Sequence, residues 1–285
     1  MAEKITLATL KKYKKQAQPI TMLTCYDYAA AVLLQQAQID SLLVGDSLAQ
    51  VVLGHNSTLP ATMDIMITLT AAVRRGAPDV YLVGDMPFLS YQVSIESALI
   101  NAGRFLTEAG CDCVKLEVDR RYLPTVQALA AAGIPLMAHL GFRPQSIHQS
   151  GQPQAAGRSA DQALQLVHDA LDMLQAGACS ILLECVPAPV AKAITQRTEL
   201  PVISCGSGPD CDGQVMVLHD MLDLPGAGSA RFAQVYAHIG NEIRTAVTRY
   251  VEQVRQREYP QPHHCYSMKD QQYAEFEKKL RELNL

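Results

Sequence analysis

The chain has 285 residues, of which 48% are hydrophobic and 18% charged, and its formal net charge is -4. This balance excludes a nucleic-acid-binding protein with a strongly basic face, and no apolar run reaches the roughly 18 residues of a membrane span. The length suffices for one large α/β domain. We therefore expect small-molecule partners rather than nucleic acid or a membrane.

The cysteines and the opening stretch MAEKITLATLKKYKKQ indicate where the protein works. The opening stretch has no apolar core of the kind found in secretory signals, and no cysteine pair has zinc-site spacing. The sequence therefore predicts reduced thiols and a cytoplasmic protein. The eight cysteines are Cys25, Cys111, Cys113, Cys179, Cys185, Cys205, Cys211 and Cys265.

Eight short β-rich runs recur along the chain. They are apolar almost throughout, as strands covered on both faces are. We expect strands over residues 20–27, 41–47, 80–87, 113–118, 135–142, 180–186, 201–208 and 214–222.

Helical patterns separate most of these runs. The stretches 94–110 and 159–177 each open with Ser, a good N-cap, and close with Ala-Gly, where Gly permits a left-handed turn. Eight strands alternating with helices predict a (β/α)8 TIM barrel. An open doubly wound sheet is the alternative, but the GxGxxG turn of its dinucleotide-binding version is missing.

The last part of the chain is expected to be helical. Residues 230–256 read as one long amphipathic helix and 273–285 as a short charged one. We expect a single barrel domain over 1–285, with strands at about 20–222 and a C-terminal helical extension over 229–285.

Polar side chains stand late in five successive predicted strands. In a barrel of this class the active site lies at the carboxyl ends of the strands, so these residues are candidates for chemistry. Lys115 and Glu117 are two apart and should point to the same side of their strand. The candidates are Asp46 and Ser47 (second strand), Asp85 (third), Lys115 and Glu117 (fourth), His139 (fifth) and Glu184 (sixth).

Four carboxylates gathered around one lysine would repel one another unless a hard cation joined them. Oxygen ligands without paired Cys or His favour Mg²⁺, and Asp46, Asp85 and Glu117 form the natural ligand trio. The alternative is that some of these acids cap helices or form ion pairs with Arg74, Arg75 or Arg104.

Several motifs, in order over roughly residues 20–225, resemble the ketopantoate hydroxymethyltransferase family. They are LTCYDY, VGDSLAQVVLGHNSTLP, AVRRG, DMPFLSY, VKLE, AHLGFRPQS, LLECVP, PVISCGSG and DGQVMVLHDML. The chain has FRPQS where the family form is LTPQS, and HQSGQPQAAGR where a glycine-rich aromatic stretch is usual.

The resemblance implies transfer of a hydroxymethyl group from 5,10-methylenetetrahydrofolate to 3-methyl-2-oxobutanoate, giving 2-dehydropantoate. It also implies Mg²⁺, a (β/α)8 barrel and a homodecamer. Metal ligands would be Asp46 and Asp85 with Glu117. Glu184 would be the catalytic base, and Asp46, Ser47, Asp85, Lys115 and His139 would bind substrate.

Two other functions remain open at this point. One is a Mg²⁺-dependent lyase or mutase acting on another small 2-oxo acid, in the style of phosphoenolpyruvate mutase or isocitrate lyase. The other is a catalytically silent barrel that serves in binding or assembly.

Overall fold

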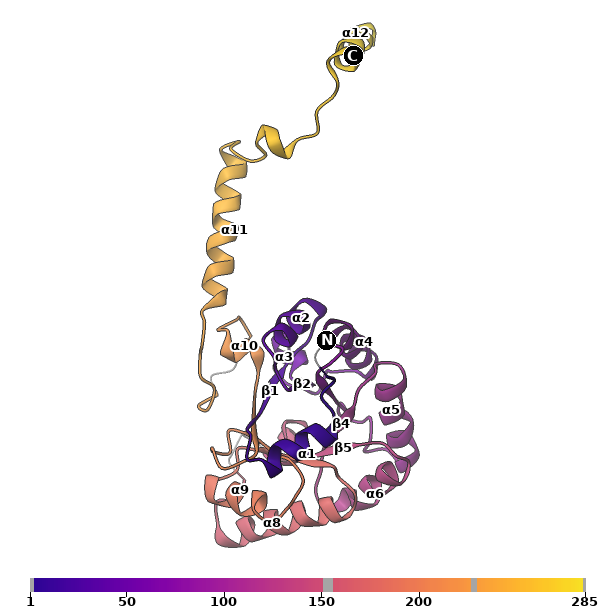
Figure 1. The fold of residues 1–285 in the computed structure, drawn as a ribbon, viewed down its shortest axis with the longest axis vertical. Coiled ribbons are helices and arrows are strands. Elements are labelled where there is room, and N and C mark those ends of the chain that lie inside the picture. Colours follow the sequence, from indigo (N-terminus) through magenta and orange to yellow (C-terminus); the bar gives the residue numbers. More distant parts are fainter. Residues whose placement is uncertain (1–2, 151–155, 227–229, 284–285) are drawn as a thin grey trace. The chain divides into compact units, whose positions relative to one another are not determined.

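Eight parallel strands close into a barrel in chain order, β1 pairing with β2 and finally with β8 (Figure 1). The structure is a computed structural model and describes residues 3–150, 156–226 and 230–283. The expected (β/α)8 barrel is confirmed, and the closed sheet excludes the open doubly wound alternative. The strands are β1 (Ile20–Thr24), β2 (Ser41–Val44), β3 (Tyr81–Asp85), β4 (Cys113–Glu117), β5 (Leu136–Gly141), β6 (Ser180–Glu184), β7 (Val202–Cys205) and β8 (Gly213–Met216).

Helices cover the outside of the barrel and shorter ones follow several strands (Figure 1). The β7–β8 connection, residues 206–212, is described throughout and forms turns instead of a helix. In the barrel unit the helices are α1 (Leu7–Lys15), α2 (Tyr28–Gln36), α3 (Leu48–Val51), α4 (Met63–Gly76), α5 (Ile95–Thr107), η1 (Arg120–Tyr122), α6 (Leu123–Ala131), η2 (Pro144–Ser146), α7 (Ile147–Ser150), α8 (Ala160–Gln175), α9 (Ala188–Thr195) and α10 (Leu218–Met221).

The predicted helix caps are present. The Ser94 side chain accepts a hydrogen bond from Ser97 N at the start of α5, and Ser159 does the same for Gln162 N at the start of α8. Gly177 closes the turn after α8 with a φ of 111°, in the left-handed region that favours glycine. Local sequence therefore sets where these helices begin and end.

The barrel interior is filled by side chains from successive strands. Tyr81, Met137 and Leu182 belong to one buried cluster, and Leu10 of α1 packs into the same cluster. Strand residues of the opposite parity form a second cluster with the surrounding helices. The part of the barrel at the amino ends of the strands is thus a packed core. A cavity can therefore form only at the carboxyl ends of the strands.

The eighth strand is shorter than the sequence predicts. The expectation of a strand over 214–222 is wrong beyond Met216, because α10 begins at Leu218. Leu218 N donates to Thr24 Oγ1 at 2.9 Å, so the side chain at the end of β1 takes the hydrogen bond that a longer strand would use in the sheet.

The single helix expected over 230–256 is also wrong in its first third. The helix α11 spans Ile239–Arg255, and residues 230–238 are not helical. Tyr236 N donates to Met221 O at 2.9 Å, and the Phe232 ring lies so close to Gly206 that a Cβ there would meet it at 2.3 Å. The Tyr236 N–H and the Phe232 ring are therefore engaged in tertiary contacts with the barrel, and this segment does not form a helix.

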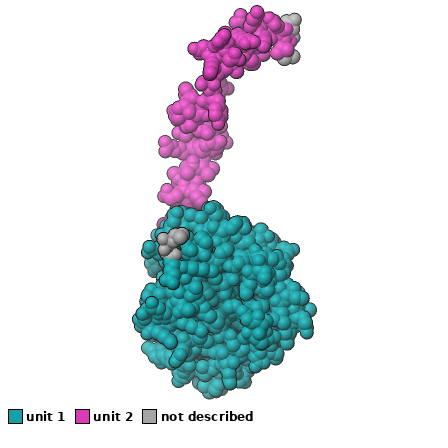
Figure 2. Space-filling model, turned by 45° about the vertical axis from the view of Figure 1, so that its right-hand side comes forward, with its two compact units in different colours: residues 1–237 teal, residues 238–285 magenta. Residues whose placement is uncertain are grey.

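Residues 238–285 form a second compact unit (Figure 2). Its helices are α11, the short η3 (Pro262–His264) and α12 (Asp270–Glu282). On α11, apolar side chains three or four residues apart form one stripe, as in an amphipathic helix. Their exposed fractions run from 42% to 55%, for Ile243, Val247, Tyr250 and Val254.

None of the described helices is both long and apolar enough to cross a membrane.

Candidate active site

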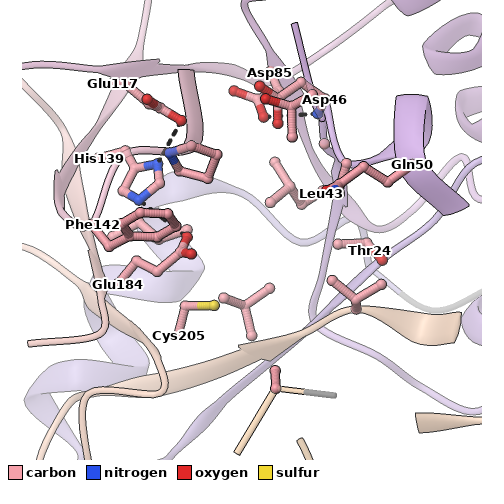
Figure 3. A pocket seen from close by; sticks show the side chains of 18 of the residues that line it. Thr24, Leu43, Asp46, Gln50, Asp85, Glu117, His139, Phe142, Glu184 and Cys205 are labelled. Atoms are coloured by element: carbon pink, nitrogen blue, oxygen red, sulfur yellow. Dashed lines mark hydrogen bonds and ion pairs between the residues drawn. The ribbon is translucent and has the colours of Figure 1, made fainter. Parts of the chain in front are cut away.

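A cavity of about 320 Å³ opens at the carboxyl ends of the strands (Figure 3). All seven candidates from the sequence line it. In Figure 3, Glu117, His139 and Glu184 follow one another along one side, and Asp46 and Asp85 lie together on another. The candidate residues are Asp46, Ser47, Asp85, Lys115, Glu117, His139 and Glu184.

The strand-end aspartates Asp46 and Asp85, each preceded by a glycine in the sequence, meet in this cavity. Asp85 Oδ2 accepts a hydrogen bond from Asp46 N at 3.0 Å, and Asp85 Oδ1 lies 2.8 Å from Lys115 Nζ. Burial raises the pKa of Asp85 to about 7, although the neighbouring Lys115 acts in the opposite direction. The positive charge that a buried aspartate at this strand end requires is thus supplied in part by Lys115.

Lys115 is buried beside carboxylates from three strand ends. Burial by itself lowers the pKa of this ammonium, but Asp85, Asp46 and Glu117 outweigh the burial and raise the pKa above its usual value. Among the described residues that line the cavity, Lys115 is the only Lys or Arg. It therefore stays charged, and three carboxyl groups face its single positive charge.

His139 lies between Lys115 and Glu184 in its neutral form. Burial lowers the pKa of the imidazole, and the charge of Lys115 lowers it further. Lys115 Nζ lies 3.3 Å from His139 Nδ1, and an ammonium can only donate there, so the ring proton is assigned to Nε2. Nε2 lies 3.3 Å from Glu184 Oε2, which places an N–H group beside that carboxylate.

Glu117 and Glu184 differ in their access to the cavity. The Glu117 side chain is 2% exposed and that of Glu184 is 19% exposed. Burial raises the pKa of Glu117 well above its usual value, and the charge of Asp46 adds to this effect. Of these two carboxylates, Glu184 is the one that a bound molecule can reach.

Ser47 lines the wall near the start of α3. Its hydroxyl lies 2.9 Å from the Tyr26 hydroxyl, and a Cβ on Gly45 would come within 2.9 Å of Ser47 Oγ. Glycine at position 45 therefore leaves room for the serine between β2 and α3.

The arginines that might have neutralised these acids are engaged elsewhere. Arg74 pairs with Asp112, and Arg104 pairs with Asp64 at 3.0 Å and with Glu108 at 2.9 Å. The ion-pair alternative is therefore wrong for these two arginines.

The cavity contains oxygen atoms suited to a divalent cation. Glu117 Oε1 is buried without a hydrogen-bond partner, and Asp85 Oδ1 has only its 2.8 Å ion-pair contact with Lys115. The described residues hold no group of three Asp, Glu, His or Cys side chains arranged around one ion. Mg²⁺ usually takes one or two carboxylates and completes its shell with water and substrate. The residues present fit such a site.

Gln145 is not among the site residues that the sequence predicts. This residue lies in η2 after β5, is 5% exposed, and donates from Nε2 to Asp46 Oδ2 at 3.0 Å. An uncharged side chain in a turn has no strand-end signal, and the only hint was its place within the FRPQS motif. It joins the candidate residues of this site.

We predict that Glu117→Gln stabilises the protein in the presence of a chelator at neutral and alkaline pH. Because burial raises the folded-state pKa of Glu117, ionisation costs stability as the pH rises above its usual value of 4.5. The variant lacks this loss, so its advantage should be absent in acid and grow as the pH rises.

Thermal unfolding at several pH values measures this difference. The exposed Glu199→Gln is the control and should follow the wild type. An advantage of Glu117→Gln that is equal in acid and alkali would contradict the interpretation.

A family model and individual relatives of this chain belong to the same enzyme family. A family model described as ketopantoate hydroxymethyltransferase matches residues 4–262. The 3-methyl-2-oxobutanoate hydroxymethyltransferase of Syntrophus aciditrophicus is 46% identical over 263 residues, covering 92% of this chain and 97% of the relative. That of Heliobacterium modesticaldum is 46% identical over 271 residues, covering 95% and 98%.

Solved structures resemble the fold at low sequence identity. A phosphonopyruvate hydrolase in complex with oxalate and Mg²⁺ has a TM-score of 0.60 at 11% identity, with 98% of both chains covered. A 2,3-dimethylmalate lyase, a member of the PEP mutase/isocitrate lyase superfamily, has a TM-score of 0.56 at 13% identity, with 96% of both covered. At this low identity the likeness to the solved structures shows the fold alone, whereas the family model and the relatives show the family. The chain belongs to the ketopantoate hydroxymethyltransferase family.

Proposed function

We propose that this protein transfers a hydroxymethyl group from 5,10-methylenetetrahydrofolate to 3-methyl-2-oxobutanoate, giving 2-dehydropantoate for pantothenate biosynthesis. The observation that carries the proposal is the convergence of Lys115, His139, Glu184 and the buried acids in one cavity of the barrel. The names of the relatives support the same reaction. In this reaction the C3–H bond of the oxo acid breaks and a C3–CH₂ bond forms. Water supplies the hydroxyl group of the product, and tetrahydrofolate is the leaving group.

Asp46 and Asp85, with Glu117, would hold Mg²⁺ together with water and substrate, after a change of side-chain position, because the described residues do not bring three such groups together around one point. When bound, the cation would supply Lewis-acid stabilisation for negative charge that develops on the keto oxygen of the oxo acid. The excess of carboxylates over Lys115 supports this assignment, because an added cation offsets their repulsion.

Lys115 and Ser47 would bind the carboxylate of the oxo acid, with His139 on the same wall. Lys115 is charged and buried, so its attraction for a carboxylate is weakly screened. Asp46 and Asp85 also line this cavity.

Glu184 would act as the base that takes the C3 proton. Its side chain is the most accessible of the carboxylates near His139, and the Nε2–H of His139 faces it at 3.3 Å. Among the described residues His139 Nε2 makes no hydrogen bond, so a small shift of either side chain would let this neutral imidazole donate to Glu184.

The cytoplasm is the compartment we propose. All eight cysteines are free thiols, as expected in a reducing environment.

The reaction is tested by mixing the protein with the oxo acid, the folate donor and Mg²⁺, with and without chelator, and following 2-dehydropantoate by mass spectrometry. We expect product that disappears with chelator. If no product forms, exchange of the C3 proton in heavy water separates the alternatives. Exchange without product would retain the oxo-acid half of the proposal, and absence of both would favour a lyase acting on another 2-oxo acid or a silent barrel.

We predict that Glu184→Gln lowers kcat by about 10²–10⁴-fold, the usual contribution of a general base. Binding of Mg²⁺ and of the oxo acid, measured by calorimetry, should stay near wild-type values. Glu199→Gln on the surface is the matched control. Equal loss of binding and turnover would show that Glu184 is a ligand instead of the base.

We also propose that the protein is a homo-oligomer, a homodecamer in line with the family resemblance. The apolar stripe on α11 supports self-association, since four side chains on one helix face are about half exposed in their own unit. Light scattering should give ten times the 31.1 kDa chain mass. Val247→Glu within the stripe should reduce the mass, whereas Thr245→Glu on the opposite face should not; a monomeric wild type would contradict the proposal.

A further inference from the structure

Gln145 is hydrogen-bonded at every position of its side-chain amide. Nε2 donates to Asp46 Oδ2 and to Met86 O, both at 3.0 Å. Oε1 accepts from the Tyr91 hydroxyl at 2.9 Å and from Gln92 Nε2 at 3.3 Å. Two donors and two acceptor sites are therefore all in use.

This pattern permits one orientation of the amide. If the amide were turned over, Oε1 would face the Asp46 carboxylate and the Met86 carbonyl, and three acceptors would meet without a proton between them. At the other end, the Gln92 amide donor requires an oxygen, whereas the Tyr91 hydroxyl has one proton for both Gln145 Oε1 and Glu117 O and can also accept. The N–H group directed at Asp46 is thus held in place by its partners.

The backbone of the same residue holds a second acid. Gln145 N donates to Glu117 Oε2 at 3.0 Å, while Glu117 Oε1 remains buried without a hydrogen-bond partner. One residue in η2 therefore contacts a carboxylate that follows β2 and another that ends β4. Glu117 Oε1, whose recorded contact is with His139 Nδ1 at 3.9 Å, is the atom left for a ligand.

The anchor behind Gln145 is rigid. Tyr91 is 2% exposed and packs edge-on against Tyr122 with ring centroids 5.6 Å apart. Its hydroxyl also lies 3.0 Å from Glu117 O, at the end of β4. Packing therefore resists any movement of the amide that would release Asp46.

We propose that Gln145 is a positioning residue for the divalent-cation site, orienting Asp46 through its side chain and Glu117 through its backbone N–H. The inference rests on the cation site of the proposed function and adds a residue to it. Groups that orient metal ligands commonly contribute about 10–100-fold to metal affinity. Carboxylates that repel one another around Lys115 need such fixed donors more than isolated ligands do.

The test is Gln145→Met in the full-length protein, with Mn²⁺ as the probe. Methionine has a similar length but no donor, and the backbone N–H to Glu117 remains, so the variant isolates the side chain. Electron paramagnetic resonance of Mn²⁺, with and without 3-methyl-2-oxobutanoate, measures affinity and the symmetry of the bound ion. We expect affinity to fall about 10–100-fold and the spectrum of the bound ion to change.

Leu129→Ala is the control for a general loss of stability. Leu129 is fully buried in α6 and does not line the cavity, so this variant should lower the Tm without changing Mn²⁺ affinity or spectrum. The exposed Gln127→Met controls for the chemical change itself. Neither control should behave like Gln145→Met.

The outcomes separate this inference from the proposed reaction. Unchanged Mn²⁺ affinity and spectrum in Gln145→Met would overturn the positioning role, as would an equal loss in Leu129→Ala. A wild-type protein that binds Mn²⁺ but makes no 2-dehydropantoate would refute the reaction alone. A wild type that binds no Mn²⁺ in either condition would overturn the cation site and the role of Gln145 together.

Discussion

The contact between Asp85 and Lys115 is the interaction on which the site depends. The two residues are register partners on neighbouring strands β3 and β4, and their charged atoms lie 2.8 Å apart with both side chains buried. Removing one partner of a buried ion pair typically costs about 3–5 kcal/mol, because the other charge is left in a poor solvent. The barrel therefore has to hold both residues at the same level along the barrel axis, as the register of β3 and β4 does.

The same register places the other candidate residues of the cavity wall. Glu117 on β4 is paired with His139 on β5, and Gly141 on β5 with Glu184 on β6. Gly141 has a φ of 99°, and a Cβ there would lie 2.3 Å from Glu184 O, so glycine allows the two strands to approach at the cavity rim. Because β3 to β6 pair in parallel and in consecutive order, their carboxyl ends bring the carboxyl, ammonium and imidazole groups of the site side by side.

Sequence alone could predict the barrel and its charged strand ends because both are local patterns. Each strand is an apolar run, and each of Asp46, Asp85 and Glu184 stands where such a run stops. Gln145 escaped because its importance arises from Asp46 and Tyr91, which are distant in the chain and meet it only after folding. The non-helical stretch 230–238 escaped for a similar reason, since contacts with Met221 and Gly206 override its helical periodicity.

The distribution of protons explains how one small cavity can hold opposite charges and still present a base. Lys115 keeps its proton because the surrounding acids raise its pKa, and this positive charge, together with burial, keeps His139 neutral. A neutral His139 can accept from Lys115 at Nδ1 and present Nε2–H toward Glu184, so the three side chains lie in one directed series. Had His139 been the charged group, it would have competed with Lys115 for the acids and formed an ion pair with Glu184. The charge of Lys115 therefore does more than pair with Asp85, since it also keeps the imidazole that lies 3.3 Å from Glu184 neutral.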